Sequence, residues 1–200
     1  NMGNAGRNGG QYYTPRPLIR TMIKLLNPKI GVKIYDPACG SAGFLCEAYE
    51  YLYEKMEKTA ANLEQLQDNT FFGKEKKNLA YIIGTMNMIL HGNATANISR
   101  GQSTLSNPAF EDKKGNLERF DYIVSNPPFS VKNWANGFDP ASDKYERFLG
   151  YGIPPDKNGD YAFLLHIIAS LKSTGKGAVI LPHGVLFRGN AEEQIRKNIV

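Results

Sequence analysis

Short runs rich in β-branched and aromatic residues alternate along this chain with longer stretches of helical periodicity, and this alternation limits the fold more than any other feature. Strands are predicted at residues 32–35, 70–73, 97–99, 120–125 and 177–181. Helices are predicted at residues 18–26, 43–58, 76–90 and 160–171. Strands that alternate with helices of about 10 to 15 residues form βαβ units, whose parallel sheet is covered on both faces. The sequence therefore predicts a mostly parallel, doubly wound α/β sheet.

The composition is that of a globular protein and narrows the functional classes only slightly. Of the 200 residues, 42% are hydrophobic and 22% are charged, which excludes a disordered chain and a coiled coil. No apolar run reaches the roughly 18 residues of a membrane span, and residues 1–10 lack the apolar stretch of a signal peptide. Two cysteines are too few for a disulfide scaffold, so we expect a cytoplasmic protein with no membrane partner. The net charge of +5 permits an anionic partner without requiring one.

The two ends of the chain favour a fragment of a longer protein. The chain begins at Asn1 rather than at a methionine, and it stops at Val200 inside an amphipathic stretch. We therefore expect residues 1–200 to form one core that is truncated before its last strands, without flanking helical and C-terminal regions. Residues 130–158 are expected to be a long loop inserted in this core.

Ligands of open parallel sheets bind outside the carboxyl ends of the strands, where the strand order reverses. The residues directly after each predicted strand should therefore be chemically unusual, and they are. They comprise residues 36–43, Glu75, residues 102–104, residues 126–129 and residues 182–184.

The segment after the first strand reads Asp-Pro-Ala-Cys-Gly-Ser-Ala-Gly-Phe, residues 36–44. Gly40 and Gly43 lie between a strand and a helix, where glycine lets a ligand approach the backbone and helix N-terminal amides are free to bind it. A tight turn without a ligand is the open alternative. The chain has neither Gly-x-Gly-x-x-Gly nor Gly-Lys-Ser/Thr here, which disfavours a dinucleotide fold and a P-loop.

Acidic and acceptor groups follow two further strands. Glu75 occupies a position where an acid accepts hydrogen bonds from ribose hydroxyls, although in the run 74–77 it also fits a solvated charge. Residues 126–129 read Asn-Pro-Pro-Phe. Prolines have no N–H, so the carbonyls around them stay available, and Asn126 and Phe129 add an acceptor and a flat apolar surface. This tetrapeptide predicts a pocket for a planar group that bears an NH₂, and simple turn chemistry is the alternative.

Four segments together carry a resemblance to a known family. They are Gln-Tyr-Tyr-Thr-Pro at residues 11–15, the segment 36–44, Asn-Pro-Pro-Phe, and Leu-Phe-Arg-Gly at residues 186–189. In this order the chain resembles the amino-methylating DNA methyltransferases of the γ arrangement, and most of all the modification (M) subunit of type I restriction-modification systems. Asn-Pro-Pro-aromatic also occurs in methyltransferases that act on RNA and on protein glutamine, so the joint occurrence carries the resemblance.

The resemblance implies a Rossmann-like class I methyltransferase that transfers a methyl group from S-adenosylmethionine to N6 of adenine in double-stranded DNA. It implies a separate specificity (S) subunit and a restriction (R) subunit as partners. The catalytic residues it implies are Asn126, Pro127, Pro128 and Phe129. The cofactor-binding residues it implies are Gln11, Tyr12, Tyr13, Thr14, Pro15, Arg16, Asp36, Gly40, Ser41, Ala42, Gly43 and Glu75. An alternative from another class is an S-adenosylmethionine-binding module without activity of its own.

The chemistry of an exocyclic amine fits these implied roles. Its lone pair is delocalised into the ring, so it is a poor nucleophile. Two acceptors, the Asn126 side-chain oxygen and the Pro127 carbonyl, can hold both N–H bonds and aim the lone pair at the methyl group. Phe129 can stack on a base that has left the duplex. No metal is needed, and no histidine or further cysteine lies at ligand spacing from Cys39 or Cys46.

Gln102 departs from the family's pattern, and the role of residues 130–158 has two alternatives. The family usually has an acidic residue after the third strand, and this chain has Gln102, which can still hydrogen-bond an adenine through its amide. Residues 130–158 interleave aromatic and basic side chains, such as Trp134 and Lys132, directly after residues 126–129, and this position predicts a lid that contacts DNA beside the target base. The equally open alternative is a loop that packs its aromatic side chains on the domain.

Overall fold

The computed structural model describes residues 13–200, so the expectations for Gln11 and Tyr12 lie outside the described residues. The strands are β1 (Ile34–Asp36), β2 (Phe71–Glu75), β3 (Asn97–Arg100), β4 (Phe120–Ser125) and β5 (Leu171–Val179). The α-helices are α1 (Arg16–Leu26), α2 (Gly43–Lys55), α3 (Ala60–Asp68), α4 (Asn78–Leu90), α5 (Asp160–Ala169) and α6 (Ala191–Ile199). Two 3₁₀ turns are η1 (Pro140–Ser142) and η2 (His183–Leu186). Among the described residues, no helix has the length and apolar character needed to cross a membrane.

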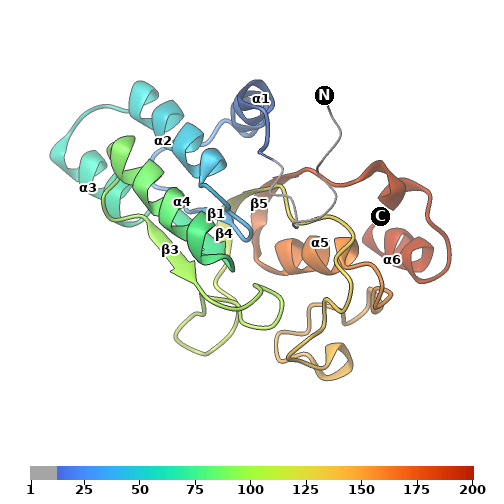
Figure 1. The fold of residues 1–200 in the computed structure, drawn as a ribbon. Coiled ribbons are helices and arrows are strands. Elements are labelled where there is room, and N and C mark those ends of the chain that lie inside the picture. The colour runs from blue at the N-terminus through green and yellow to red at the C-terminus, as the bar shows by residue number, and fades with distance from the viewer. Residues whose placement is uncertain (1–12) are drawn as a thin grey trace.

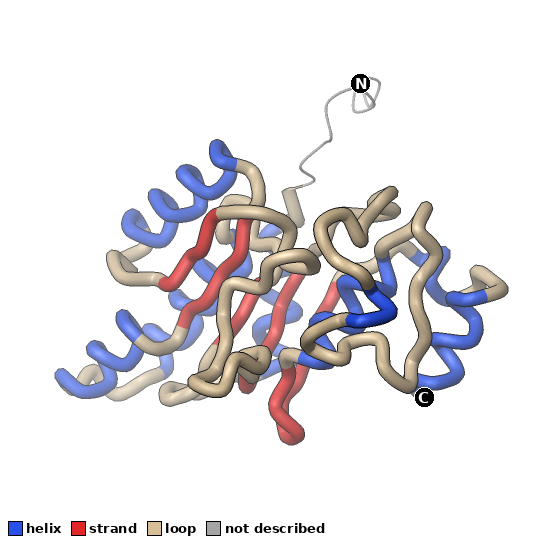
Figure 2. The backbone as a smooth tube through the Cα atoms, turned by 90° about the horizontal axis from the view of Figure 1, so that it is seen from below, coloured by secondary structure: helices blue, strands red, loops and turns tan. Residues whose placement is uncertain are grey.

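The strands form one five-stranded sheet in the order β3-β2-β1-β4-β5, and each pair of neighbours is parallel. Figure 1 shows α1, α2 and α4 together on one side of the strands and α5 on the other. Figure 2 shows the strands side by side in one layer. The predicted parallel, doubly wound sheet is confirmed. The strand order reverses between β1 and β4, which is where a ligand site is expected.

Strand β4 links the two helical layers, and it occupies Phe120–Ser125 as predicted. Val124 belongs to the core cluster that includes α1 and α2. Ile123 belongs to the cluster on the other face, with Tyr35 and Ile167. Successive side chains of a strand point to opposite faces, and burying one aliphatic side chain contributes about 1.5–3 kcal/mol. A strand that is apolar on both faces therefore stabilises both layers.

The helix predicted at residues 43–58 is too long, and the helix that follows it, α3, was not predicted. The helix expected at residues 43–58 ends at Lys55, because Met56 takes an extended conformation. Thr59 then begins α3, since its hydroxyl accepts a hydrogen bond from the Asn62 N–H. This threonine cap is the signal that divides one apparent helix into two.

Strand β5 differs from its predicted range of 177–181. It begins at Leu171, and α5 therefore ends at Ala169 instead of residue 171. After Leu171 the added residues are polar or glycine and largely exposed, and the pairing with β4 is irregular between Phe120 and Tyr122. Such a segment has no alternation of apolar and polar side chains, so its sequence did not indicate a strand.

Residues 130–158 lie against α5 and contain the short turn η1. Trp134 and Phe148 are each 4% exposed and share a core cluster with Tyr161 of α5. The Trp134 indole N–H donates a 3.0 Å hydrogen bond to the Pro155 carbonyl. These contacts support the packed alternative for the aromatic side chains, while Lys132 remains exposed.

A buried chain of hydrogen bonds connects this loop to the sheet. The Tyr35 hydroxyl lies 3.1 Å from Thr104 Oγ1, which lies 3.2 Å from His166 Nε2. Arg147 Nη1 lies 3.4 Å from His166 Nδ1, and Arg147 forms a 2.6 Å salt bridge with Asp143. A guanidinium only donates, so His166 Nδ1 accepts and Nε2 carries the proton that it donates to Thr104. Burial first, and the Arg147 charge second, lower the His166 pKa to about 3, so the ring is neutral.

The neutral ring of His166 should make stability depend on pH. The unfolded chain takes up a proton at His166 near the ordinary pKa of 6.5, whereas the folded protein resists protonation down to about pH 3. The free energy of unfolding should therefore fall below about pH 6.5, by up to about 1.4 kcal/mol per pH unit from this group. His166→Gln removes this contribution. In urea titrations the stability advantage of the wild type over His166→Gln should shrink from about pH 7 to about pH 5. A difference that stays constant over this range would contradict the assignment.

Candidate functional site

The carboxyl ends of β1, β2 and β4 open into one cleft of about 830 Å³. The predicted site residues that line it are Tyr13, Thr14, Arg16, Asp36, Gly40, Ser41, Gly43, Glu75, Asn126, Pro127, Pro128 and Phe129. Two predicted residues stand beside the cleft: Pro15 is exposed before α1, and Ala42 is fully buried. Parallel strands thus bring segments that are distant in the sequence to one edge of the sheet.

Asp36 ends β1 and is 1% exposed. Its Oδ1 accepts hydrogen bonds from the Ala38 N–H at 3.0 Å and from the Ser125 hydroxyl at 2.8 Å. Burial raises the Asp36 pKa to about 7, and the nearby charge of Glu75 adds to this, while the two hydrogen bonds oppose it. A cation bound beside Asp36 would stabilise the ionised carboxylate.

Glu75 connects the end of β2 to the loop after β1. Its Oε2 accepts a 2.9 Å hydrogen bond from the Gly40 N–H, and its Oε1 accepts a 2.7 Å bond from the Lys77 N–H. A carboxylate offers about four acceptor positions, so Glu75 keeps acceptor capacity toward the cleft. Gly40 has φ of 52°, and a Cβ built on it would meet nothing within 4 Å. The loop therefore leaves open space beside its backbone, as a ligand requires.

Asn126 follows β4 and has the most unusual hydrogen bonding in the cleft. Its Nδ2 donates a 3.0 Å hydrogen bond to Thr14 Oγ1. Its Oδ1 is buried and has no hydrogen-bond partner in the described part of the chain. An unpaired buried acceptor costs about 1–3 kcal/mol, so it indicates an atom that a ligand satisfies. Phe129, three residues on, keeps 41% of its surface exposed at the same cleft.

Helix α4 supplies site residues that sequence reasoning missed. A Cβ on Gly84 would lie 2.8 Å from the Gly40 carbonyl oxygen, so only glycine lets α4 pack this closely on the loop. The Asn87 side chain donates a 2.9 Å hydrogen bond to the Ser41 carbonyl and lines the cleft. The only sequence signal was a glycine inside a helical pattern, which points to close backbone packing.

The sequence suggested that Gln102, after β3, could hydrogen-bond an adenine, but the structure does not place this residue at the cleft. Gln102 is exposed and does not line the cleft, whereas Ser103 and Thr104 do. The Thr104 hydroxyl also accepts the hydrogen bond from His166 Nε2 that was described above. Lys74 also lines the cleft, is 2% exposed, and has a pKa lowered by burial.

The two cysteines are buried and free. Burial raises the Cys39 pKa well above its usual value, so this thiol is a poor nucleophile and a poor metal ligand. The Cys46 Sγ lies 3.5 Å from Met88 Sδ in the core between α2 and α4. Within residues 13–200 no group of three or more His, Cys, Asp or Glu side chains is arranged to hold a metal ion.

The fold and the position of the cleft define a class of protein. A putative class I S-adenosylmethionine-dependent methyltransferase of Listeria monocytogenes superposes with a TM-score of 0.65 at 15% identity, over 92% of this chain and 49% of that chain. This likeness shows that the fold is that of class I methyltransferases. The family model for N-6 DNA methylases matches residues 1–200, and the chain belongs to this family.

Named relatives agree with the resemblance seen in the sequence. The type I restriction enzyme MjaIX methylase subunit of Methanocaldococcus jannaschii is 33% identical over 98% of this chain and 33% of its own length. The EcoEI methylase subunit of Escherichia coli is 35% identical over 95% of this chain and 36% of its own length. The crystal structure of the type I methyltransferase subunit from Streptococcus thermophilus is 32% identical, with a TM-score of 0.77 over 98% of this chain and 40% of that chain. The chain therefore spans about a third of the length of these curated relatives.

Gly84 provides a test of the packing between α4 and the loop after β1. Elsewhere in a helix, replacing glycine by alanine stabilises by about 0.5–1 kcal/mol. Here we expect Gly84→Ala to lower the free energy of unfolding by about 1–3 kcal/mol, because the Gly40 backbone must move. Urea denaturation measures the change. Met86→Ala, on the exposed side of the same helix, should stay within about 0.5 kcal/mol of the wild type. A Gly84→Ala variant more stable than the wild type would refute the close contact.

Proposed function

We propose that this chain is the catalytic core of a methyltransferase that transfers a methyl group from S-adenosylmethionine to the N6 amino group of adenine in DNA. The observation that carries the proposal is the buried Oδ1 of Asn126, which has no partner in the described part of the chain and belongs to a cleft-lining residue. Membership of the N-6 DNA methylase family supports the same reaction.

The cleft fits S-adenosylmethionine in size and charge. Its volume of about 830 Å³ falls within the roughly 300–1,000 Å³ usual for small-molecule sites. Asp36 and Glu75 bring two carboxylates to a ligand that carries a sulfonium and an ammonium group. Glu75 is the residue proposed to bind the ribose hydroxyls, and Thr14 and Arg16 to hold the methionine end. When bound, the cofactor supplies an activated methyl group.

The residues after β4 would then position the acceptor amine. Asn126 Oδ1 accepts one N–H of the amine, and the Pro127 carbonyl accepts the other. Holding both N–H bonds favours a pyramidal nitrogen whose lone pair points at the methyl donor, so catalysis consists mainly of positioning and electrostatics. Phe129 is exposed enough to stack on an adenine that has left the duplex, which offsets part of the cost of unstacking.

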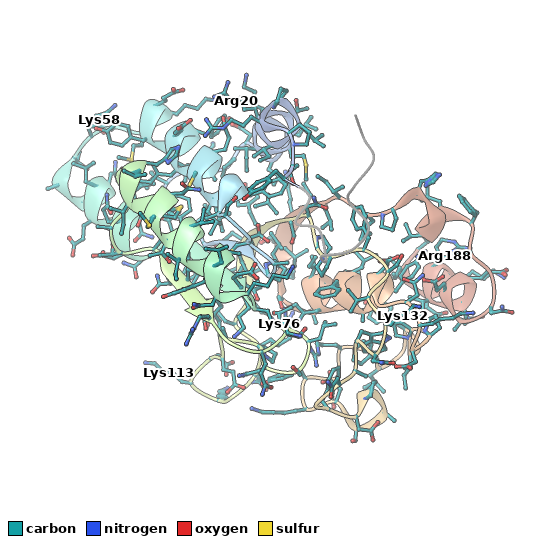
Figure 3. All side chains as sticks on the ribbon, viewed as in Figure 1. Arg20, Lys58, Lys76, Lys113, Lys132 and Arg188 are labelled. Atoms are coloured by element: carbon teal, nitrogen blue, oxygen red, sulfur yellow. The ribbon has the colours of Figure 1, made fainter. Side chains whose placement is uncertain are left out.

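Recognition of DNA requires more than this core. Figure 3 shows Arg20, Lys58, Lys113, Lys132 and Arg188 spread over different parts of the molecule. A net charge of +5 that is spread in this way gives weak attraction to phosphates. We therefore infer that the whole protein is the modification subunit of a type I restriction-modification system, with specificity and restriction subunits as partners. The names of the relatives, which are methylase subunits of type I restriction enzymes, support this.

The proposed domain organisation follows from the same comparison. Residues 1–200 form the catalytic core, residues 130–158 are an insertion after the catalytic segment, and other parts of the whole protein flank the core. The relatives are about three times as long as the match, which supports flanking regions. Two free, buried cysteines are consistent with a cytoplasmic protein.

Asn126→Ala tests the reaction in the full-length protein with its partner subunits. Removing the acceptor should lower kcat for methyl transfer to adenine in duplex DNA by at least about 10²-fold. The dissociation constant of S-adenosylmethionine should change far less, by under about tenfold or roughly 1.4 kcal/mol, because Asn126 reaches the cofactor site only through its hydrogen bond to Thr14. Radiolabelled methyl transfer and calorimetry provide the two measurements. Asn69→Ala, at the exposed end of α3, is the matched control and should keep wild-type kcat.

Three outcomes would overturn the proposal. Transfer to adenine that survives Asn126→Ala would remove the assigned mechanism. Transfer by the wild type to RNA or to protein glutamine instead of DNA would change the substrate class. Binding of S-adenosylmethionine without any transfer, in the presence of the partner subunits, would identify the chain as a binding module.

A further inference from the structure

The Asp160 carboxylate connects the segment after β4 with the Leu-Phe-Arg-Gly segment at residues 186–189. Asp160 is the first residue of α5 and is 1% exposed. Its Oδ1 accepts a 2.7 Å hydrogen bond from the backbone N–H of Ser130, the residue after Phe129. Its Oδ2 forms a 2.6 Å salt bridge with Nη2 of Arg188.

Arg188 belongs to the Leu-Phe-Arg-Gly segment, which no step of the proposed reaction uses. Figure 3 shows it in the part of the molecule formed by α5 and α6. Its Nε forms a second salt bridge of 2.6 Å, with Glu192 of α6. In the amide orientation that matches donors with acceptors, Asn158 donates to Asp160 Oδ2 at 2.8 Å and accepts from Arg188. Burying a carboxylate costs several kcal/mol unless it is paired, and these partners offset that cost for Asp160.

The Ser130 backbone needs such an anchor. Ser130 has φ of 51°, in the left-handed region that costs about 1–2 kcal/mol for residues other than glycine. The Gly159 N–H donates a 2.9 Å hydrogen bond to the Val131 carbonyl, so the start of α5 holds this turn at two neighbouring points. The bond to Asp160 fixes the plane of the peptide between Phe129 and Ser130.

The segment between the strand and this anchor is short and stiff. At its start, the Ser125 carbonyl accepts a 2.9 Å hydrogen bond from the Ile180 N–H, which ties the end of β4 to the residue after β5. Pro127 and Pro128 have a fixed φ of about −65°, so little rotational freedom remains in between. With both ends held, the Asn126 oxygen and the Phe129 ring have defined positions.

We propose that Asp160, held by Arg188, is a positioning residue for residues 126–129. It accepts the Ser130 N–H and so holds the catalytic segment at the distance that methyl transfer requires. The expected effect on kcat rests on the proposed function, because the proposed function assigns the catalytic role to Asn126. The competing account is that Asp160 only neutralises Arg188, in which case the Ser130 hydrogen bond has no influence on turnover.

Two double variants separate these accounts. Asp160→Asn with Arg188→Met and Asp160→Ala with Arg188→Met both lack the salt bridge and carry the same charge. They differ in one respect that matters here: asparagine keeps an oxygen that accepts the Ser130 N–H, and alanine does not. Both variants are made in the full-length protein and assayed with the partner subunits on duplex DNA.

We expect the alanine double variant to show a kcat at least about tenfold below that of the asparagine double variant, because small misplacements of reacting groups cost up to about 10²-fold. The dissociation constant of S-adenosylmethionine should agree between them within about threefold, since residues 36–43 and Glu75 are unchanged. Hydrogen exchange of the Ser130 amide should be faster only in the alanine double variant. A purely structural salt bridge would affect the two variants equally.

Asp160→Glu is the second variant in case the alanine double variant does not fold. It keeps the charge for Arg188 but moves the acceptor by one methylene, so kcat should fall while affinity for S-adenosylmethionine is kept. Glu193→Ala is the control, because it removes an exposed 2.7 Å salt bridge with Lys197 on α6 and should leave kcat unchanged.

Equal kcat and equal Ser130 exchange in the two double variants would overturn the inference. Wild-type kcat in Asp160→Glu would do the same. If the wild type does not methylate adenine, the proposed function fails, and the exchange rates alone still decide whether Asp160 anchors the segment.

Discussion

Parallel pairing of β1 with both β2 and β4 is the constraint on which the site depends. Ile34 pairs with Phe71 on one side and with Tyr122 on the other, so three strands run the same way and end at one edge. The chain must cross over after each strand, and the crossovers after β1 and after β4 leave in opposite directions, toward β2 and toward β5. The cleft forms between them because neither covers that edge. The proposed roles of Asp36, Glu75 and Asn126 depend on this cleft, because all three residues line it.

The sequence predicted those parts of the site that can be recognised from neighbouring residues in the chain. Strand β4 and the tetrapeptide after it are contiguous, and the apolar run gives the strand while the prolines end it. Glu75 and the loop at residues 36–43 were predicted because each lies at the carboxyl end of a strand, and the rule for parallel sheets then placed them at one edge. Their distances and hydrogen-bond partners were not predictable, since these depend on crossovers between segments up to 112 residues apart, as for Thr14 and Asn126.

The parts that the sequence did not predict depend on contacts between elements. Gly84 is only a glycine inside a helical pattern until the structure shows that a Cβ there would lie 2.8 Å from the Gly40 carbonyl oxygen. His166 reads as a core or rim residue, and only its burial beside Arg147 makes it a neutral donor that supports Thr104. Strand β5 begins before its apolar run because Leu171 pairs with Phe120 of β4, and after an irregular polar stretch the pairing resumes at Lys176. Tertiary context overrides local preference in each case.

Glu75 shows how several roles of one side chain limit the substitutions that its position can accept. Each of its carboxylate oxygens already accepts a backbone amide, one from the loop after β1 and one from the start of α4. The same side chain is proposed to face the ribose of the cofactor. Any substitution there alters the shape of the loop and the recognition of the sugar together. The shape of the loop and the proposed contact with the sugar therefore cannot vary independently at this position.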